Sequence, residues 1–302
     1  MKLSIIWVYV LVIFSMLFWG LSFVWFKIVN PFYSPITIIF LRLLISSSML
    51  YFIIRIFRFR YKVKQKDVKY FLLLAFCQPF CYFLGESYGL TKVSSTVSAV
   101  IIATIPLFTP IVAYYFVHEK LSLFHFIGMI VSFSGIIIMI INPDLSFNAS
   151  PQGIFLLFFA VASAVAFSAV IRKISPDYSP LTITFYQNLL GSVYFLPLFF
   201  IFDYQNFIYT TPSWNAIAAL LQLAVFASSL AYLFYVIGLN RIGLNKASLY
   251  ANLIPVFTAF FSFFILGEQF TFAKILGIAV VIVGVMISQL DKLNNRLKLR
   301  KL

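Results

Sequence analysis

The chain has 302 residues, of which 63% are hydrophobic, 20% are aromatic and only 10% are charged. A soluble domain carries about 25% charged residues to cover its surface, so this composition excludes an ordinary water-soluble protein and indicates a surface that faces lipid. The formal net charge of +14 would suit nucleic-acid binding, but the basic residues lie in short connections between apolar runs, which is typical of membrane topology.

Ten apolar runs follow one another, and each is long enough to cross a hydrocarbon core of about 30 Å as a helix. The first, from Ile5 to Phe26, is too long for the apolar part of a signal peptide and is expected to be retained. No run shows the alternation of barrel strands. The predicted spans are residues 5–27, 34–55, 69–90, 95–117, 123–141, 152–172, 180–202, 214–238, 245–266 and 271–290.

The basic residues predict which side of the membrane each connection faces, because Lys and Arg concentrate on the cytoplasmic side. When the N-terminus is placed inside, most of them lie in inner connections and in the two tails. Only Lys27, Lys92 and Lys274 then lie outside, and Arg42 lies within a span. We therefore expect a multi-pass protein of the cytoplasmic membrane with both termini inside.

The two halves of the chain resemble each other. At one constant offset, Gly89 aligns with Gly238 and Pro106 aligns with Pro255, with matches at many positions between and around them. Such sustained similarity indicates an internal duplication. Each copy contains five spans, an odd number, so the second copy enters the membrane from the opposite side.

The predicted fold is therefore an all-α membrane protein with ten transmembrane helices in two inverted five-helix repeats. The first repeat is expected to occupy residues 1–145 and the second, inverted repeat residues 146–291. Residues 292–302 are expected to form a basic cytoplasmic tail.

Pro106 and Pro255 lie inside the predicted fourth span of each half. A proline within a helix frees a carbonyl, which is tolerated at membrane depth only where protein or a water-filled cavity satisfies it. Two symmetry-related kinks favour a central cavity that opens to either side, although simple packing irregularity is the alternative. Glu119 and Glu268, which follow these prolines, are expected to anchor short turns near the membrane surface.

Small residues form a stripe on the fifth and tenth spans. Gly128, Ser132 and Gly135 share one face of the fifth, and Gly277 and Gly284 repeat the pattern on the tenth. Small residues let helices approach closely in lipid. The stripes are expected to pack either between the halves or in a homodimer, so a monomer and a homodimer both stay open.

The sequence does not favour an enzyme, a metal site or a bound cofactor. Cys77 and Cys81 lie one helical turn apart, where a disulfide has poor geometry and two ligands are too few for a metal. The two histidines stand apart from any carboxylate cluster. The absence of a Walker-type loop indicates that ATP is not the direct energy source.

Three features resemble the EamA family of the drug/metabolite transporter (DMT) superfamily: FWGLSF at Phe18, the arginine in the second span, and the twice-repeated Pro–(x12)–Glu block with a following glycine. The resemblance covers essentially the whole chain. It implies a ten-helix transporter with both termini inside, built from inverted five-helix repeats. Members of this family mostly export amino acids and other small metabolites, and the substrate differs between members.

Two charged residues lie at membrane depth, where ionisable groups are costly and often functional. At about 1.5 Å per residue, Arg42 lies ~12 Å and Glu86 ~6 Å from the outer ends of their spans. They are expected either to form a structural ion pair or to bind a substrate. In the second case Arg42 holds a carboxylate or phosphate through two hydrogen bonds, and Glu86 holds an ammonium group or a coupling proton.

Further polar and aromatic residues are expected to line the same pathway. On the third span, Gly85 and Gly89 share one helical face with three polar residues, and the repeat-related position of Arg42 is Gln187. An aromatic cage for a flat or cationic substrate is an additional possibility. The predicted substrate-binding residues are Trp19, Ser22, Arg42, Gln78, Tyr82, Glu86, Gln187, Asn188, Tyr232, Tyr235 and Asn252.

The sequence predicts a secondary-active transporter that exports a small metabolite, such as an amino acid or related zwitterion, by alternating access between two inverted repeats. Its expected partners are the lipid bilayer and the metabolite. A multidrug efflux carrier for amphipathic compounds is the second interpretation, and a non-transporting membrane scaffold is a third from another class. Proton coupling through Glu86 and facilitated exchange are both open.

Overall fold

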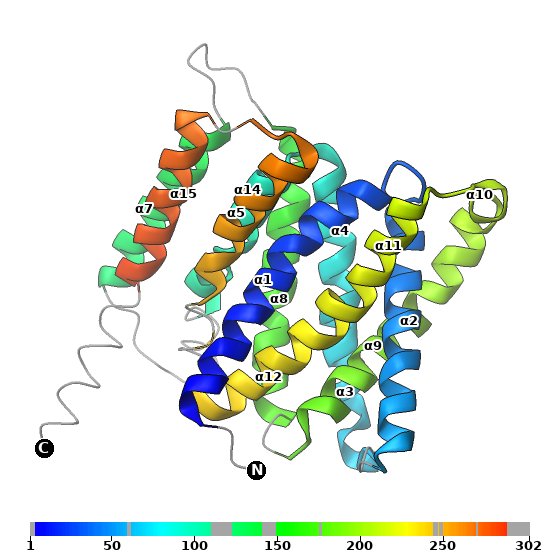
Figure 1. Cartoon of the computed structure of the whole chain (residues 1–302). Helices are drawn as coiled ribbons and strands as arrows, with labels where there is room; N and C mark the ends of the chain where they lie inside the picture. Colours follow the sequence, from blue (N-terminus) through cyan, green and yellow to red (C-terminus); the bar gives the residue numbers. More distant parts are fainter. Residues whose placement is uncertain are drawn as a thin grey trace, which may run out of the picture.

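The computed structural model describes residues 4–58, 62–109, 123–140, 149–174, 177–243, 247, 250–269 and 271–288. Every regular element within these ranges is helical, which confirms the predicted all-α class. Figure 1 shows the helices side by side in one bundle. In this view the first turn of α1 and the last turn of α15 lie toward the same end of the bundle.

The α-helices have the following bounds: α1 Ile5–Val29, α2 Pro35–Ile56, α3 Val68–Ala75, α4 Tyr82–Lys92, α5 Ser95–Ile102, α7 Leu123–Ile140, α8 Pro151–Ile174, α9 Pro180–Leu198, α10 Tyr204–Tyr209, α11 Trp214–Gln222, α12 Ala231–Ile242, α14 Leu253–Leu266 and α15 Phe272–Ser288. Two short 3-10 turns are η1 Gln65–Asp67 and η5 Tyr250–Asn252. Three wider, π-type turns are η2 Phe76–Cys81, η3 Phe199–Asp203 and η4 Leu223–Leu230.

Seven continuous helical runs are long and apolar enough to cross a membrane: residues 5–29, 35–56, 65–92, 123–140, 151–174, 180–209 and 214–242. Three shorter apolar helices, at residues 95–109, 250–266 and 272–288, lie where the remaining spans are predicted. The chain is therefore a multi-pass membrane protein. Ten crossings and cytoplasmic termini stay predictions.

Several helices begin at a serine that caps them. The hydroxyls of Ser34, Ser94, Ser179 and Ser213 each accept a hydrogen bond from the backbone N–H three residues later. A proline follows Ser34 and Ser179 at the first helical position, where its missing N–H needs no partner. These local signals explain why the helices begin close to the residues predicted from the sequence.

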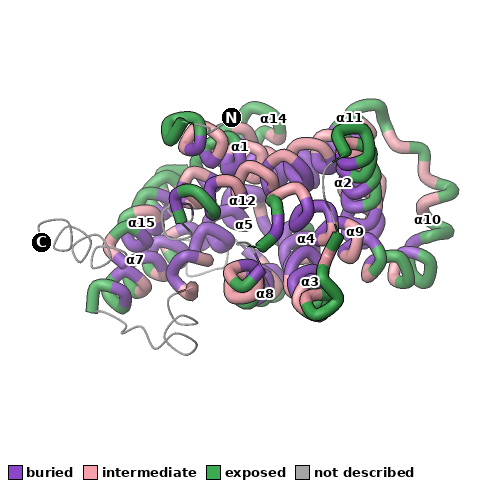
Figure 2. Tube along the Cα trace, turned by 90° about the horizontal axis from the view of Figure 1, so that it is seen from below, coloured by how far each residue is buried: buried purple, intermediate pink, exposed green. Residues whose placement is uncertain are grey.

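The helices pack in pairs. α7 packs along α15, α2 along α9, and α4 along α8, while α1 contacts both α12 and α14. Figure 1 shows the α7–α15 pair at one edge of the bundle. Figure 2 shows buried positions on the sides of the helices that face the interior and exposed positions on the outer sides. Large apolar side chains such as Ile130, Phe155 and Phe272 occupy this outer surface, as lipid contact requires.

The small-residue stripes pack against each other within the chain, on α7 and α15. A Cβ atom built on Gly284 would lie 2.4 Å from Ser132 Oγ, and one on Gly128 would lie 2.5 Å from the Gly284 carbonyl oxygen. Ser132 Oγ also donates to the carbonyl of Val281 over 3.2 Å. The stripes were expected to pack either between the halves or in a homodimer. In this structure the glycines form a contact between the halves.

The two prolines lie in similar surroundings. The helix of the fourth span breaks at Ala103–Thr104 and resumes at Ile105, so Pro106 lies in the first turn after the break. Pro255 likewise lies in the first turn of α14, after the η5 turn. A first-turn position suits proline because the helix makes no use of an N–H there. Glu119 lies outside the described residues.

Candidate functional site

A cavity with a volume of about 90 Å³ lies inside the bundle. Its wall includes Pro106 and many of the predicted substrate-binding residues, namely Trp19, Ser22, Arg42, Gln78, Tyr82, Glu86, Tyr232 and Tyr235. The remaining wall is mostly apolar and consists of Phe23, Phe83, Ile102, Ile105, Ala164, Phe167, Ser168, Ala251 and Ile254. Residues from both halves of the chain thus enclose one space.

Arg42 lies in α2, and only 3% of its surface is exposed. Its Nε–H donates to Ser228 Oγ over 2.8 Å, and its guanidinium carbon lies 4.4 Å from the centre of the Phe83 ring. Stacking on an aromatic ring stabilises a cation where water is scarce. Among the residues that the structure describes, neither terminal Nη atom has a hydrogen-bond partner, so both are available to a ligand.

Glu86 lies on α4 with 8% of its surface exposed. One carboxylate oxygen accepts a hydrogen bond of 2.7 Å from the Tyr82 hydroxyl, one turn earlier on the same helix. The other oxygen has no donor within the described ranges. Arg42 and Glu86 form no direct ion pair in this part of the chain, although both face the same cavity.

The wide turn η4 contacts Arg42 through Ser228, and side-chain donors from α1, from α9 and from η4 itself hold the turn and the start of α12. In lipid, every backbone polar group must be satisfied within the protein, and π-type turns are frequent at functional sites. The donors and their carbonyl acceptors are Ser15 to Ala231 (2.7 Å), Trp19 to Ala227 (3.3 Å), Asn188 to Ser228 (2.7 Å) and Ser229 to Ala224 (2.9 Å).

The third predicted span is not one continuous helix. Gln78 has extended backbone angles (φ −148°, ψ 118°) and interrupts the helix just before Pro79. Of the single helical face expected for this span, the polar residues Gln78, Tyr82 and Glu86 do face one cavity, but its two glycines do not. Gln78 still reaches the cavity and donates to the Tyr232 hydroxyl over 2.6 Å.

Gly85 and Gly89 do not line the cavity but pack against α8. A Cβ atom on Gly85 would lie 2.6 Å from the Leu156 carbonyl oxygen and 2.9 Å from the Ala160 nitrogen. A Cβ atom on Gly89 would lie 2.8 Å from a side-chain carbon of Leu157. Their small size serves a close contact between two helices.

Three aromatic residues of the cavity wall pack together. The Trp19 ring lies 5.1 Å from the Tyr232 ring and 5.2 Å from the Tyr235 ring, measured between centroids. Tyr82 packs instead against Phe83 at 5.4 Å. Among the residues that the structure describes, the Tyr235 hydroxyl has no hydrogen-bond partner and is free to bind a polar solute.

Some predicted site residues lie outside the cavity wall. Gln187 is fully buried, and within the described ranges neither atom of its amide has a partner. Asn188 is 1% exposed and donates to Ser46 Oγ and to the Ser228 carbonyl, each over 2.7 Å. Asn252 lies in η5, beside the lining residue Ala251.

Sequence reasoning missed other lining residues. Phe83 was hidden among many phenylalanines that were expected to face lipid, and only its position under Arg42 distinguishes it. Phe167 and Ser168 lie on α8, where the charges, Arg172 and Lys173, are confined to the last turn and mark no inner face. Within the described part of the chain, no three His, Cys, Asp or Glu side chains gather as a metal ion requires.

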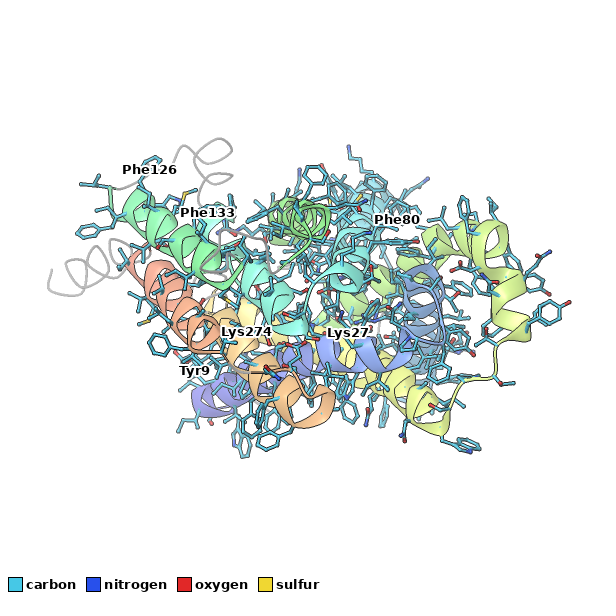
Figure 3. All side chains as sticks on the ribbon, turned by 90° about the horizontal axis from the view of Figure 1, so that it is seen from above. Tyr9, Lys27, Phe80, Phe126, Phe133 and Lys274 are labelled. Atoms are coloured by element: carbon cyan, nitrogen blue, oxygen red, sulfur yellow. The ribbon has the colours of Figure 1, made fainter. Side chains whose placement is uncertain are left out.

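A second polar cluster lies where α1 ends and α5 begins. Lys27 donates to the Val93 carbonyl over 2.9 Å, and Glu268 accepts hydrogen bonds from the backbone of Ser95 and Thr96 at the start of α5. Seen from above, Lys27 lies toward the middle of the bundle (Figure 3). Glu268 was expected to anchor a short turn; in the structure its side chain caps α5, a helix of the first half.

The comparisons with known proteins agree with this architecture. The chain matches the EamA-like transporter family over residues 6–141 and 151–289. It is 26% identical over 231 residues to the uncharacterized transporter YetK of Bacillus subtilis, covering 76% of this chain and 70% of that protein. It is also 26% identical over 270 residues to an uncharacterized transporter of Archaeoglobus fulgidus, covering 89% and 94%.

Two further matches are more distant. A chloroplastic WAT1-related protein of Arabidopsis thaliana is 24% identical over 277 residues, covering 89% of this chain and 66% of that protein. One solved crystal structure superposes on 91% of this chain and 98% of its own with a TM-score of 0.65 at 13% sequence identity, which shows the shared fold. The family match spans nearly the whole chain, and its relatives are named transporters. The protein therefore belongs to the EamA-like transporter family and is a membrane transporter.

Proposed function

We propose that the protein is a secondary carrier of the cytoplasmic membrane that exports an amino acid or a related zwitterion. The observation that carries this proposal is the arrangement of Arg42 and Glu86. They face one cavity, and each has bonding capacity that the described protein groups leave unused. A structural ion pair would instead join the two charges directly.

The geometry suggests a role for each group. The free Nη atoms of Arg42 suit a carboxylate, because a guanidinium binds it through two parallel hydrogen bonds. The free oxygen of Glu86 suits the ammonium group of the same molecule. The aromatic side chains of Trp19 and Tyr235 offer an apolar surface for the rest of the solute.

Alternating access between two inverted repeats supplies the movement in this proposal. The packing pairs support it, since the repeat relation carries the α4–α8 contact onto α12–α1 and the α5–α8 contact onto α14–α1. The contacts of α2 with α9 and of α7 with α15 map onto themselves. This pattern is expected of two five-helix units related by a two-fold axis in the membrane plane.

Multidrug efflux is the second candidate, and the aromatic wall favours it. Amphipathic compounds would use Trp19, Tyr232 and Tyr235 and would not need the guanidinium. Coupling by a proton on Glu86 and facilitated exchange both fit the arrangement and differ in their response to a pH gradient.

Purified protein in liposomes, screened against labelled amino acids with and without a pH gradient, tests the proposal. We expect saturable uptake of at least one amino acid, which Arg42→Gln abolishes without lowering the amount of folded protein. Ser163→Ala is the matched control, because this serine bonds only to the Phe159 carbonyl of its own helix. Unchanged amino-acid uptake in Arg42→Gln overturns the proposal, and retained transport of uncharged drugs alone supports multidrug efflux.

A further inference from the structure

The position of the Arg42 guanidinium depends on very few contacts. Within the described residues these are the Nε–H bond to Ser228 Oγ at 2.8 Å and the stack on Phe83 at 4.4 Å. The stack is compatible with rotation of the guanidinium in its own plane, because a ring face offers no fixed acceptor. The hydroxyl of Ser228 therefore determines which edge of the guanidinium turns toward the cavity.

Ser228 is held in turn by a directed chain of hydrogen bonds from α9 and α2. One N–H of the Asn188 amide donates to the Ser228 carbonyl, and the other donates to Ser46 Oγ, each over 2.7 Å. Ser46 Oγ lies 2.6 Å from Ser229 Oγ, which donates to the Ala224 carbonyl at 2.9 Å. Every donor in this chain has an acceptor when Ser46 donates to Ser229. Asn188 thus holds the wide turn at the Ser228 carbonyl and, through Ser46, at Ser229.

The other half of the chain lacks this arrangement. The repeat-related positions of Arg42, Ser228 and Asn188 are Gln187, Pro79 and Leu43. Pro79 and Leu43 offer no side-chain hydrogen bond, and in the described ranges the Gln187 amide is left without a partner. If the network served only to hold two helices together, both halves would need it. It is present only where the charged side chain is.

From this geometry we infer that Asn188 and Ser228 are positioning residues, which orient Arg42 and thereby set the selectivity of the cavity for solutes with a carboxylate. The inference rests on the proposed function and assigns Asn188 a role behind the cavity wall and not in contact with the solute.

The test is a kinetic comparison in liposomes, with the labelled amino acid that the wild-type protein transports best. Ser228→Ala and Asn188→Leu, the latter the residue found at the repeat-related position, should each raise the KM about 10-fold or more and leave Vmax nearly unchanged. Arg42→Lys keeps the charge but lacks the Nε–H, so it should raise the KM similarly. The double variant Arg42→Lys/Ser228→Ala should be no worse than either single variant, since both remove the same bond. Ser192→Ala is the control on α9, because its hydroxyl bonds only to Leu189.

The outcomes separate the two proposals. If the Arg42→Gln variant takes up the amino acid normally, the proposed function itself is overturned. If Arg42→Gln abolishes uptake but the KM is unchanged in Ser228→Ala and Asn188→Leu, only the positioning role is overturned. The positioning role is also overturned if these variants lower Vmax and the amount of folded protein together at constant KM, because a structural role then explains the loss. It is overturned too if the effects of Arg42→Lys and Ser228→Ala on the KM add in the double variant.

Discussion

Removing the Glu268 carboxylate should loosen the contact between the end of α14 and the start of α5. This carboxylate accepts hydrogen bonds from the Ser95 N–H at 2.7 Å, from the Thr96 N–H at 3.4 Å and from Thr96 Oγ1 at 2.8 Å. The first N–H groups of a helix have no partner within it. Ser94 Oγ accepts from the Val97 N–H at 3.3 Å, so Glu268 serves the earlier donors that this serine does not reach.

The size of the effect follows from these contacts. Loss of a helix N-cap costs about 0.5–2 kcal/mol, and loss of a negative charge beside a helix N-terminus costs about 0.3–1 kcal/mol. Glu268→Ala removes both contributions, which together amount to roughly 1–3 kcal/mol. Glu268→Gln keeps an acceptor oxygen and loses mainly the charge, so its cost should lie near 0.3–1 kcal/mol.

Thermal unfolding of the purified protein in detergent measures this loss. On the scale of soluble domains, Glu268→Ala should lower the unfolding midpoint by roughly 2–10 °C, and Glu268→Gln by less. Gln269→Ala is the control, because this neighbour is exposed and only its backbone carbonyl accepts a hydrogen bond. Equal midpoints for Glu268→Ala and wild type, or an equal fall in Gln269→Ala, would refute the assignment of Glu268 as a cap.

Three shorter predictions concern packing and charge. Gly284→Leu should separate α7 from α15, because a Cβ atom already meets Ser132 Oγ at 2.4 Å, and should cost about 1–3 kcal/mol in the same unfolding assay. Gly85→Ala should also lower stability, because the added Cβ atom meets Ala160, but it should leave the KM of the remaining folded protein unchanged. A changed KM would indicate that Gly85 lines the cavity. Glu86→Gln should raise the KM for a zwitterion roughly 10-fold or more and spare solutes without an ammonium group, as uptake competition would show.

The membrane class, the approximate spans and the two buried charges were all accessible to sequence reasoning. Apolar runs in lipid have few alternatives to helices, because the backbone must satisfy its own hydrogen bonds. Arg42 and Glu86 were conspicuous because charges are costly at depth. Their immediate partners were not accessible, since the bond from Arg42 to Ser228 joins residues 186 positions apart.

The third span was misjudged in two respects: it is not one continuous helix, and its glycines do not share the cavity face. Helical periodicity places Gln78 and Gly85 on one face only if every turn between them is regular. Pro79 was the available signal, because proline does not continue a helix hydrogen-bond ladder. Beyond the break, the direction of α4 follows from its contact with α8, and that contact involves residues far away in the chain.

Local composition was sufficient to establish what surrounds this protein and which of its residues are expensive to bury. The length of an apolar run, the basic residues in a connection and a duplicated proline can each be read from a short segment. Each span must also match the bilayer by its own length and composition. The division of roles among the polar residues is different, because it depends on which helices meet. Only the packed bundle distinguishes Glu86, which faces the cavity, from Asn188, which stands behind it, since hydrogen bonds form across space and not along the sequence.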